Sequence, residues 1–260
     1  MAWKEYYIYN IENTSLTGGN GTAFTESTLR TDTDADVELI KRTHVATNNK
    51  ILAKFKDDAY GRLYQNSAMD IRDISGAPVS DITVGSISQH KGMIPFILPR
   101  PVLIRAATTF TAELSDFSGF TNSLRLAMHG AKIRAGKAPW EEQWRATPSF
   151  DYTTGVVSIG ANQTASINIS VNIDAHFLIR KITSTRDGAA LITVKDGATD
   201  RQWMNTAVHI DNFAGNAHFP NILAAPRFIY KGSVINVTIQ DLSGAANQIR
   251  LNFHGEKLFL

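Results

Sequence analysis

The sequence predicts an all-β fold made of two tandem jelly-roll-like β-sandwich domains joined by a short linker. Three observations predict it: an internal duplication, short segments in which apolar and polar residues alternate, and Gly-containing turn signals between those segments. The chain has 260 residues, of which 43% are hydrophobic and 19% are charged, and this balance suits folded domains. Since domains usually hold about 100–150 residues, the length accommodates two of them.

The duplication is clearest in a stretch that aligns without gaps. Residues 116–133 read DFSGFTNSLRLAMHGAKI, residues 241–258 read DLSGAANQIRLNFHGEKL, and nine of the eighteen positions are identical. Further identities run upstream at a slightly different offset, from Asp34 with Asp174 to Gly76 with Gly215. Each copy therefore spans about a hundred residues, the size of one ordinary domain.

We expect four segments along the chain. Residues 1–30 are predicted as an N-terminal arm, 31–133 as the first domain, 134–149 as the linker and 150–260 as the second domain. The first copy has fourteen more residues than the second between its Gly76 and Pro101, and we place this surplus in a loop insertion at 79–92. The linker carries Trp140 and Trp144, which we expect to clamp the domains together rather than to bind a ligand.

Alternation with a period of two predicts the strands. Ile235, Val237 and Ile239 face one way, while the polar residues between them face the other. About eight such segments per copy fit a jelly roll better than an immunoglobulin-type sandwich. Short helices are expected only in the linker and in residues 20–33.

The repeated motif Asn-x-x-Arg-Leu-x-x-His-Gly-x-Lys, preceded by Asp-x-Ser-Gly, predicts a structural corner that occurs twice. The Asp should accept backbone N–H bonds in a tight turn. Alternation should place Leu124, Leu126 and Met128 on one face of a strand and Arg125, Ala127 and His129 on the other. Gly130 and Gly255 should each permit a bend or a bulge where the backbone comes close to another group. The corner residues are Asp116, Gly119, Asn122, Arg125, His129, Gly130 and Lys132 in the first copy and Asp241, Gly244, Asn247, Arg250, His254, Gly255 and Lys257 in the second.

No catalytic motif is present, so we predict no enzyme, no catalytic residues and no cofactor. G-x-S-x-G, a P-loop and a G-x-G-x-x-G after a strand are all missing. Zero cysteines exclude disulfides and thiolate metal sites. Among seven histidines only His129 and His254 pair across the repeat, and we favour a hydrogen-bonded role over a metal site for them.

Three aspartates near the start of the first domain hint at a hard-cation site. Asp32, Asp34 and Asp36 would share one face of an extended chain, and carboxylates are the ligands that calcium prefers. The Gly-bearing turn and the distal acid of familiar calcium loops are missing, so we favour a capping role and assign no metal.

Charge and hydropathy limit the partners. The net charge is +2, from 26 basic and 24 acidic residues, and no Lys/Arg block exceeds a pair, so no direct nucleic-acid contact is expected. No apolar run approaches the ~20 residues of a membrane span, and the N-terminus lacks a signal peptide. We expect synthesis in the cytoplasm.

The aromatic residues of the predicted arm leave two possibilities open. Trp3, Tyr6, Tyr7 and Tyr9 precede a Gly- and Thr-rich stretch, and such a segment can become ordered on a neighbouring subunit as an assembly arm. Alternatively, these side chains pack as the first strand of the core.

A set of motifs resembles small β-rich virion proteins encoded among bacteriophage structural genes. The set is the run Asp34-Ala-Asp36, the run from Lys56 to Arg62, the Pro-x-x-Leu-Pro-x-Pro segment at 95–101, and the repeated corner. The second copy departs from it, with Asp200 at the Gly position before Arg201 and only Ala225-Pro226 left of the proline segment. Two jelly rolls in one chain are also similar to the major capsid proteins of membrane-containing phages, whose trimers form pseudo-hexagonal tiles.

This resemblance implies a non-enzymatic bacteriophage virion protein of the head, acting as a capsid decoration, minor capsid or shell subunit. It would be made in the host cytoplasm, would form a homo-oligomer, with a trimer preferred, and would bind other virion proteins. The alternative is a carbohydrate-binding or receptor-binding module of a phage tail or spike. That alternative needs exposed aromatic side chains, and the candidates are Phe117, Phe120, Trp203 and Tyr230.

Overall fold

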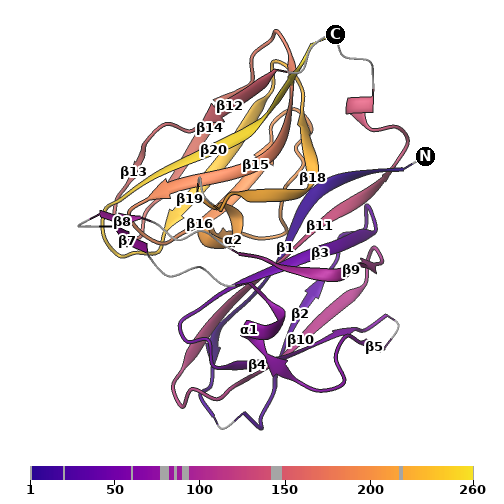
Figure 1. The fold of residues 1–260 in the computed structure, drawn as a ribbon, viewed down its shortest axis with the longest axis vertical. Helices are drawn as coiled ribbons and strands as arrows, with labels where there is room; N and C mark the ends of the chain where they lie inside the picture. The colour runs from indigo at the N-terminus through magenta and orange to yellow at the C-terminus, as the bar shows by residue number, and fades with distance from the viewer. Residues whose placement is uncertain are drawn as a thin grey trace.

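The computed structural model describes residues 2–19, 21–59, 61–76, 82–84, 87–89, 94–141, 148–216 and 219–259. Within these ranges the chain forms two β-sandwiches, one above the other in Figure 1. The helical elements are short: α1 (Ile71–Ile74), α2 (Ile210–Phe213) and a 3-10 turn, η1 (Pro139–Glu141). None of the described helices is long and apolar enough to cross a membrane.

The first sandwich consists of two antiparallel sheets. One sheet has the strand order β1 (Ala2–Leu16), β11 (Asn122–Ala135), β3 (Val37–Ala46), β9 (Phe96–Ile104). The other has the order β2 (Thr25–Arg30), β10 (Thr109–Asp116), β4 (Ile51–Asp57), β5 (Arg62–Leu63), with β6 (Met69–Asp70) also paired to β4.

The second sandwich repeats this arrangement. One sheet has the order β12 (Ser149–Thr153), β20 (Asn247–Leu258), β15 (His176–Arg186), β18 (Asn221–Ile229), with β13 (Val157–Ile159) also paired to β20. The other has the order β14 (Thr164–Ser170), β19 (Val234–Asp241), β16 (Ala190–Asp196), β17 (Val208–His209). A small hairpin, β7 (Ile82–Val84) with β8 (Ile87–Gln89), lies in the predicted insertion 79–92, whose other residues lie outside the described ones.

Strand order identifies each sandwich as a jelly roll. Eight principal strands can be numbered along each copy if β5, the β7–β8 hairpin and β13 are left aside. They are β1, β2, β3, β4, β6, β9, β10 and β11 in the first copy and β12 and β14 to β20 in the second. In both copies one sheet has the order 1-8-3-6 and the other 2-7-4-5. Two interlocked Greek keys produce this order. The predicted class, two tandem all-β jelly rolls, is confirmed.

The predicted N-terminal arm is instead part of the first jelly roll. Residues 2–16 form β1, which pairs with β11 from Ala2 to Leu16, and residues 25–30 form β2, which pairs with β10. The reason is the alternation within β1, since Tyr7, Tyr9 and Ile11 all enter the core of this sandwich. The helix expected in residues 20–33 is therefore wrong, and the connection between the domains shortens to the residues between Ala135 and Ser149.

Gly130 and Gly255 of the repeated corner lie at matched β-bulges, as the sequence predicts. Pairing of β11 with β3 skips Ile40 beside Gly130, and pairing of β20 with β15 skips Arg180 beside Gly255. A Cβ atom on Gly130 would lie 2.5 Å from the carbonyl oxygen of Glu38, and one on Gly255 would lie closer still to that of Leu178. Only glycine therefore fits where the bulged strand crosses its neighbour.

We expect Gly255→Ala to lower the free energy of unfolding by about 1–3 kcal/mol, because backbone atoms must move to admit the new methyl group. Chemical denaturation measures the change. The matched control is Gly160→Ala in the same domain, where the nearest heavy atom is the movable Cγ of Gln163 at 3.3 Å. Equal effects of the two substitutions would contradict the close approach at Gly255.

Candidate functional site

The repeated corner is a turn in which the Asp of the motif accepts several backbone hydrogen bonds. Asp241 Oδ1 accepts from the backbone N–H of Ser243 at 3.1 Å, and Asp241 Oδ2 accepts from those of Gly244 at 3.1 Å and Asn162 at 2.9 Å. In the first copy the Asp116 carboxylate accepts from the backbone N–H of Ser118. Gly119 and Gly244 both have left-handed φ angles, +81° and +70°. The predicted Asp-x-Ser-Gly turn is thus present in both copies.

The Asn of the motif fastens this turn to a neighbouring loop. Asn122 Oδ1 accepts from the backbone N–H of Asn48 at 2.9 Å, and Asn122 Nδ2 donates to Asn48 O at 2.6 Å. Asn247 Oδ1 accepts in the same way from Gly188 N–H at 2.9 Å, and its Nδ2 donates to Ala189 O at 3.3 Å. Both asparagines are buried, so these bonds replace water that the loops have lost.

The Lys that closes the motif pairs with aspartate beside an aromatic ring. Lys132 Nζ lies 2.7 Å from Asp32, 3.0 Å from Asp34 and 4.0 Å from the ring centre of Tyr7. Lys257 Nζ lies 2.8 Å from Asp174 and 4.3 Å from the ring centre of Phe150. Both lysines therefore tie the last strand of their copy to the loop before its third strand.

The three aspartates that hinted at a cation site are each paired with a basic side chain. Besides Lys132, Asp34 contacts Arg134 at 2.8 Å. Asp36 contacts Arg105 at 2.6 Å and accepts the backbone N–H of Ala106 at 2.9 Å. No group of three or more acidic or histidine side chains placed to hold a metal is present among the described residues.

The two repeated histidines share one hydrogen bond and differ in the other. His129 Nε2 lies 2.9 Å from Thr43 Oγ1, and His254 Nε2 lies 2.8 Å from the corresponding Thr183 Oγ1. Each ring makes its second hydrogen bond through Nδ1. His129 Nδ1 lies 2.9 Å from the hydroxyl of Tyr6, whereas His254 Nδ1 lies 2.9 Å from Asp151 Oδ1.

The Thr183–His254–Asp151 chain has the order of a nucleophile, a base and an orienting acid. It borders a surface groove of about 720 Å³. The same Thr–His pair recurs at His129, which is fully buried and whose burial lowers its pKa well below the ordinary histidine value. Because the pair exists where no substrate can reach it, its shared role is to join the third and eighth strands of each copy.

The other face of the motif forms the junction between the two jelly rolls. Leu124, Leu126 and Met128 enter the core of the first sandwich, as predicted, and Ala127 joins a cluster made mainly of second-domain residues. Tyr6 and Ile8 of β1 belong to that same cluster. The backbone N–H of Ile8 donates to Trp203 O at 2.9 Å, and the backbone N–H of Asn205 donates to Ile8 O at 3.3 Å. One strand thus contributes to two cores.

A buried carboxylate lies at the centre of this junction. Glu5 lies 2.9 Å from Arg227, 3.0 Å from Arg134 and 3.6 Å from Arg201. Only 1% of the Arg227 side chain and 6% of the Glu5 side chain are exposed. Burial lowers the pKa of Arg227 to about 10, partly offset by the nearby Glu5, so Arg227 remains charged at neutral pH. Lys41 adds a second polar contact, since its Nζ donates to Asn221 Oδ1 at 2.7 Å.

The linker adds an aromatic clamp, as predicted for Trp140. Its ring contacts Trp3 of β1 edge-to-face at 5.4 Å and Phe228 of β18 at 6.4 Å. Trp144 lies outside the described residues. Trp3, Tyr6, Tyr7 and Tyr9, the aromatic residues of the predicted assembly arm, are thus used within the chain: Tyr6 and Trp3 at the junction and Tyr7 and Tyr9 in the first core.

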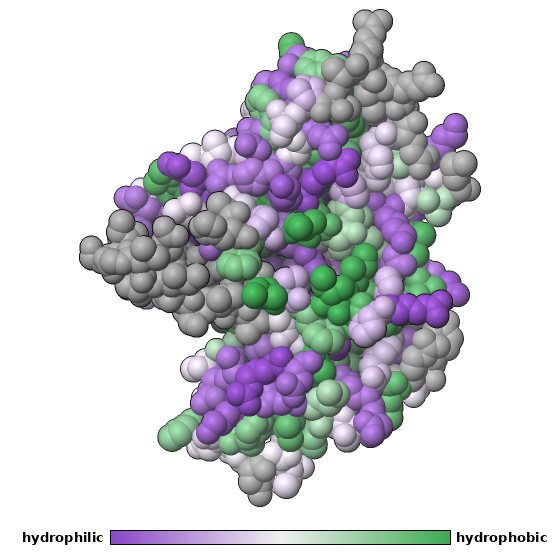
Figure 2. All heavy atoms as spheres, viewed as in Figure 1, coloured by the Kyte–Doolittle hydropathy of each residue, from purple (hydrophilic) through white to green (hydrophobic). Residues whose placement is uncertain are grey.

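The surface of the junction carries an apolar band that sequence analysis missed. Ile97 on β9 and Ile222 on β18 occupy equivalent positions in the two copies and are 68% and 62% exposed. They line one cavity of about 440 Å³, and Ile94 and Phe219 are exposed nearby in the chain. Figure 2 shows apolar side chains gathered where the two sandwiches meet. Matching the two copies by strand register would have found the pair.

The aromatic residues considered for glycan binding are scattered. Trp203 is fully buried, so it cannot serve as a stacking surface. Tyr230 packs edge-to-face on Phe228 at 5.1 Å. Phe120, at 76% exposure on the turn of the first corner, is the candidate that faces solvent most fully.

No protein-family model matches the chain, and no curated protein matches its sequence. Among solved structures, a chain from Sulfolobus turreted icosahedral virus aligns over 97% of this chain and 60% of its own length, with 9% identity and a TM-score of 0.27. The mavirus major capsid protein aligns over 96% and 86%, with 9% identity and a TM-score of 0.20. The N-glycanase PNGase F aligns over 96% and 95%, with 11% identity and a TM-score of 0.24. This chain therefore spans about 60% of the length of the Sulfolobus virus chain. All of these weak similarities concern the β-sandwich fold alone.

We expect Asp241→Asn to lower the melting temperature at pH 7, because the mutant loses a charge-assisted acceptor. Hydrogen bonds from the Ser243 hydroxyl and from the Asn162 N–H hold the pKa of Asp241 well below its usual value. A depressed folded-state pKa stabilises the protein above the unfolded value of about 4, and this stabilisation disappears as the pH falls through the folded value. The difference from wild type should therefore narrow between pH 7 and pH 2. A melting-temperature difference between wild type and Asp241→Asn that stays constant with pH would contradict this role of the Asp241 carboxylate.

We expect Glu5→Gln to destabilise the chain by about 3–5 kcal/mol, because Arg227 would keep a buried charge without its counter-ion. Denaturant unfolding measures this, with Glu38→Gln as the control, since its partner Lys4 is half exposed and such pairs contribute about 0–1 kcal/mol. The double variant Glu5→Gln/Arg227→Met should lose less unfolding free energy than the sum of the losses in the two single variants. Strict additivity would show that the pair is not coupled.

Proposed function

We propose that this chain is a non-enzymatic structural protein of a bacteriophage virion, a head component that acts through symmetric protein–protein contacts. It would serve as a capsid decoration, minor capsid or shell subunit, made in the host cytoplasm and assembled as a homo-oligomer, with a trimer preferred. The observation that carries the proposal is the exposed apolar band at the junction, where Ile97 and Ile222 lie at equivalent positions of two joined jelly rolls.

The rigidity of the junction supports this role. Strand β1 packs into both domains, the Glu5–Arg227 pair is buried between them, and Trp140 clamps them from outside. A subunit whose domains share a buried interface can present its contact surfaces at a constant angle, as a closed symmetric assembly needs. The motif resemblance to bacteriophage virion proteins points in the same direction.

The band itself suits contact with another protein. Large exposed apolar side chains that cluster, rather than occurring singly, mark interaction surfaces. Two isoleucines on neighbouring edge strands, with Ile94 and Phe219 close in sequence, form such a cluster. Sandwich edges also expose unpaired backbone groups, which a partner subunit can cover.

The carbohydrate- or receptor-binding role in a tail or spike remains the second candidate, and Phe120 is the observation that favours it. Its ring is 76% exposed at a turn tip, where aromatic side chains stack on ligands. Binding on a glycan array that disappears in Phe120→Ala would favour this role over the structural one.

We expect the purified protein to form a closed oligomer, and the substitutions Ile97→Asp and Ile222→Asp to shift it to monomers, because a buried unpaired carboxylate opposes association. Light scattering coupled to size exclusion measures the mass. The matched control is Ile173→Asp, at a position that is 83% exposed in a turn of the second domain. A wild-type protein that stays monomeric at high concentration would overturn the proposal.

A further inference from the structure

The first jelly roll contains a cavity beside its third strand, β3. It has a volume of about 340 Å³ and lies between β3, β9 and the segment that carries α1. Its walls are mostly apolar, with Leu39, Ile74, Phe96, Leu98, Val102 and Phe110 among them. This volume falls at the lower end of the range for small-molecule pockets, about 300–1,000 Å³.

A buried arginine lies in the wall of this cavity. Arg42 is 7% exposed, and its guanidinium lies 4.6 Å from the ring centre of Phe55 on the opposite sheet and 5.5 Å from that of Phe96. No described carboxylate lies within ion-pair distance of Arg42, and its Nε has no hydrogen-bond partner. Burial lowers the pKa of Arg42 only to about 10, so the side chain remains charged at neutral pH.

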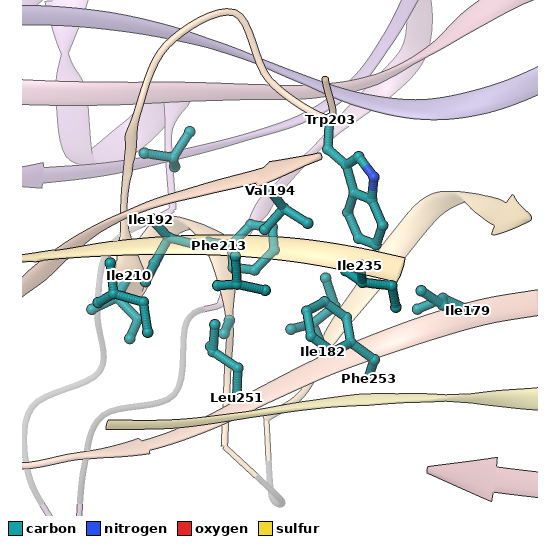
Figure 3. Close-up of a cluster of buried hydrophobic side chains, with 14 of the residues drawn as sticks. Ile179, Ile182, Ile192, Val194, Trp203, Ile210, Phe213, Ile235, Leu251 and Phe253 are labelled. Atoms are coloured by element: carbon teal, nitrogen blue, oxygen red, sulfur yellow. The ribbon is translucent and has the colours of Figure 1, made fainter. Parts of the chain in front are cut away.

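The duplication provides an internal comparison. The residue equivalent to Arg42 is Ile182, since Arg42 pairs with Met128 and Ile182 pairs with Phe253. Ile182 lies in the second core together with Trp203 and Phe213. In the aligned copies, Trp203 is the equivalent of Tyr64 and Phe213 is the equivalent of Ile74. Figure 3 shows Ile182 beside Phe253, with Trp203 and Phe213 in the same cluster of buried side chains. The second copy thus has larger side chains at these two positions. Its buried cation is Arg227, at the position equivalent to Val102, and this arginine is paired with Glu5 at 2.9 Å.

An unpaired buried cation is costly unless something satisfies it. The other charged side chains that line the cavity are Arg100 and Asp73, so the lining carries a net positive charge. A guanidinium offers a planar set of donors that matches a carboxylate or a phosphate oxygen pair. The walls around it suit an aliphatic or aromatic body.

We propose that this cavity binds a small amphiphilic anion, with its acidic group on Arg42 and its apolar body against Leu39, Phe96 and Phe110. Straight-chain carboxylates of medium length have the required chemistry. This site is independent of the proposed virion function, since the cavity faces the interior of one sandwich and its test does not involve assembly.

The test is isothermal titration of the full chain with sodium octanoate, with 1-octanol and sodium acetate as the matched probes. Octanol keeps the apolar body without the charge, and acetate keeps the charge without the body. We expect saturable octanoate binding and about 10- to 100-fold weaker binding of octanol, because hydrogen bonds to charged groups contribute about 1.5–3 kcal/mol. Acetate should bind weakly or not at all. Octanol binding as tightly as octanoate, or no octanoate binding, would overturn the proposal.

Two variants locate the site. Arg42→Ile places the residue of the second copy at this position, and it should abolish octanoate binding while raising the melting temperature. Ile74→Phe keeps Arg42 and fills the cavity with the side chain found at Phe213, so it should also abolish binding. This variant keeps the test available if Arg42→Ile fails to fold. The control is Arg72→Ala, which removes an exposed arginine paired with Asp70 outside the cavity and should leave the affinity unchanged. Unchanged octanoate affinity in Arg42→Ile and Ile74→Phe would place binding elsewhere and refute the assignment.

Discussion

Strand β1 is the constraint on which the rest of the structure depends, because its two faces belong to different cores. Tyr7, Tyr9 and Ile11 complete the first sandwich, while Tyr6 and Ile8 are packed into the second. The backbone of Ile8 also exchanges hydrogen bonds with Trp203 and Asn205. A strand buried on both sides couples the stability of the two domains. The two jelly rolls therefore form one structural unit and not two independent domains joined only by a linker.

The duplicated scaffold has diverged where its environment differs. The Asp-x-Ser-Gly turn, the Asn tether, the bulge glycine and the Lys–Asp pair are kept in both copies because they satisfy backbone geometry that the jelly roll imposes on each. The two repeated histidines both contact a Thr, but their second partners differ. His129 bonds to Tyr6 inside the junction, and His254 bonds to Asp151 at the surface. Position 42 differs further: it is an arginine beside a cavity, whereas its equivalent, Ile182, is packed within the second core. The conserved set maintains the fold, and the differences are where function can be added.

The proposed functions draw on separate parts of the molecule. Assembly would use the outside of the junction, where equivalent isoleucines on two edge strands are brought side by side. The proposed anion site uses the interior of the first sandwich. Because the two lie on different faces of β3 and its neighbours, a virion subunit can hold a small ligand without giving up its contact surface.

Sequence by itself determined the fold class, the duplication and the local chemistry of the corner. Alternation with a period of two and the repeated Asp, Gly, Asn and Lys act over a few residues or between two aligned copies, so their consequences follow from spacing. The tertiary structure alone decided the strand order, the place of residues 2–16 and the junction. Glu5 meets Arg227, and Arg42 meets Phe55, only after distant segments pack, and no local pattern encodes which face of a strand will meet a second domain. The arm was mispredicted for this reason: a strand with two buried faces has a nearly continuous run of large side chains, and the partner that buries the second face lies about 200 residues away in the chain.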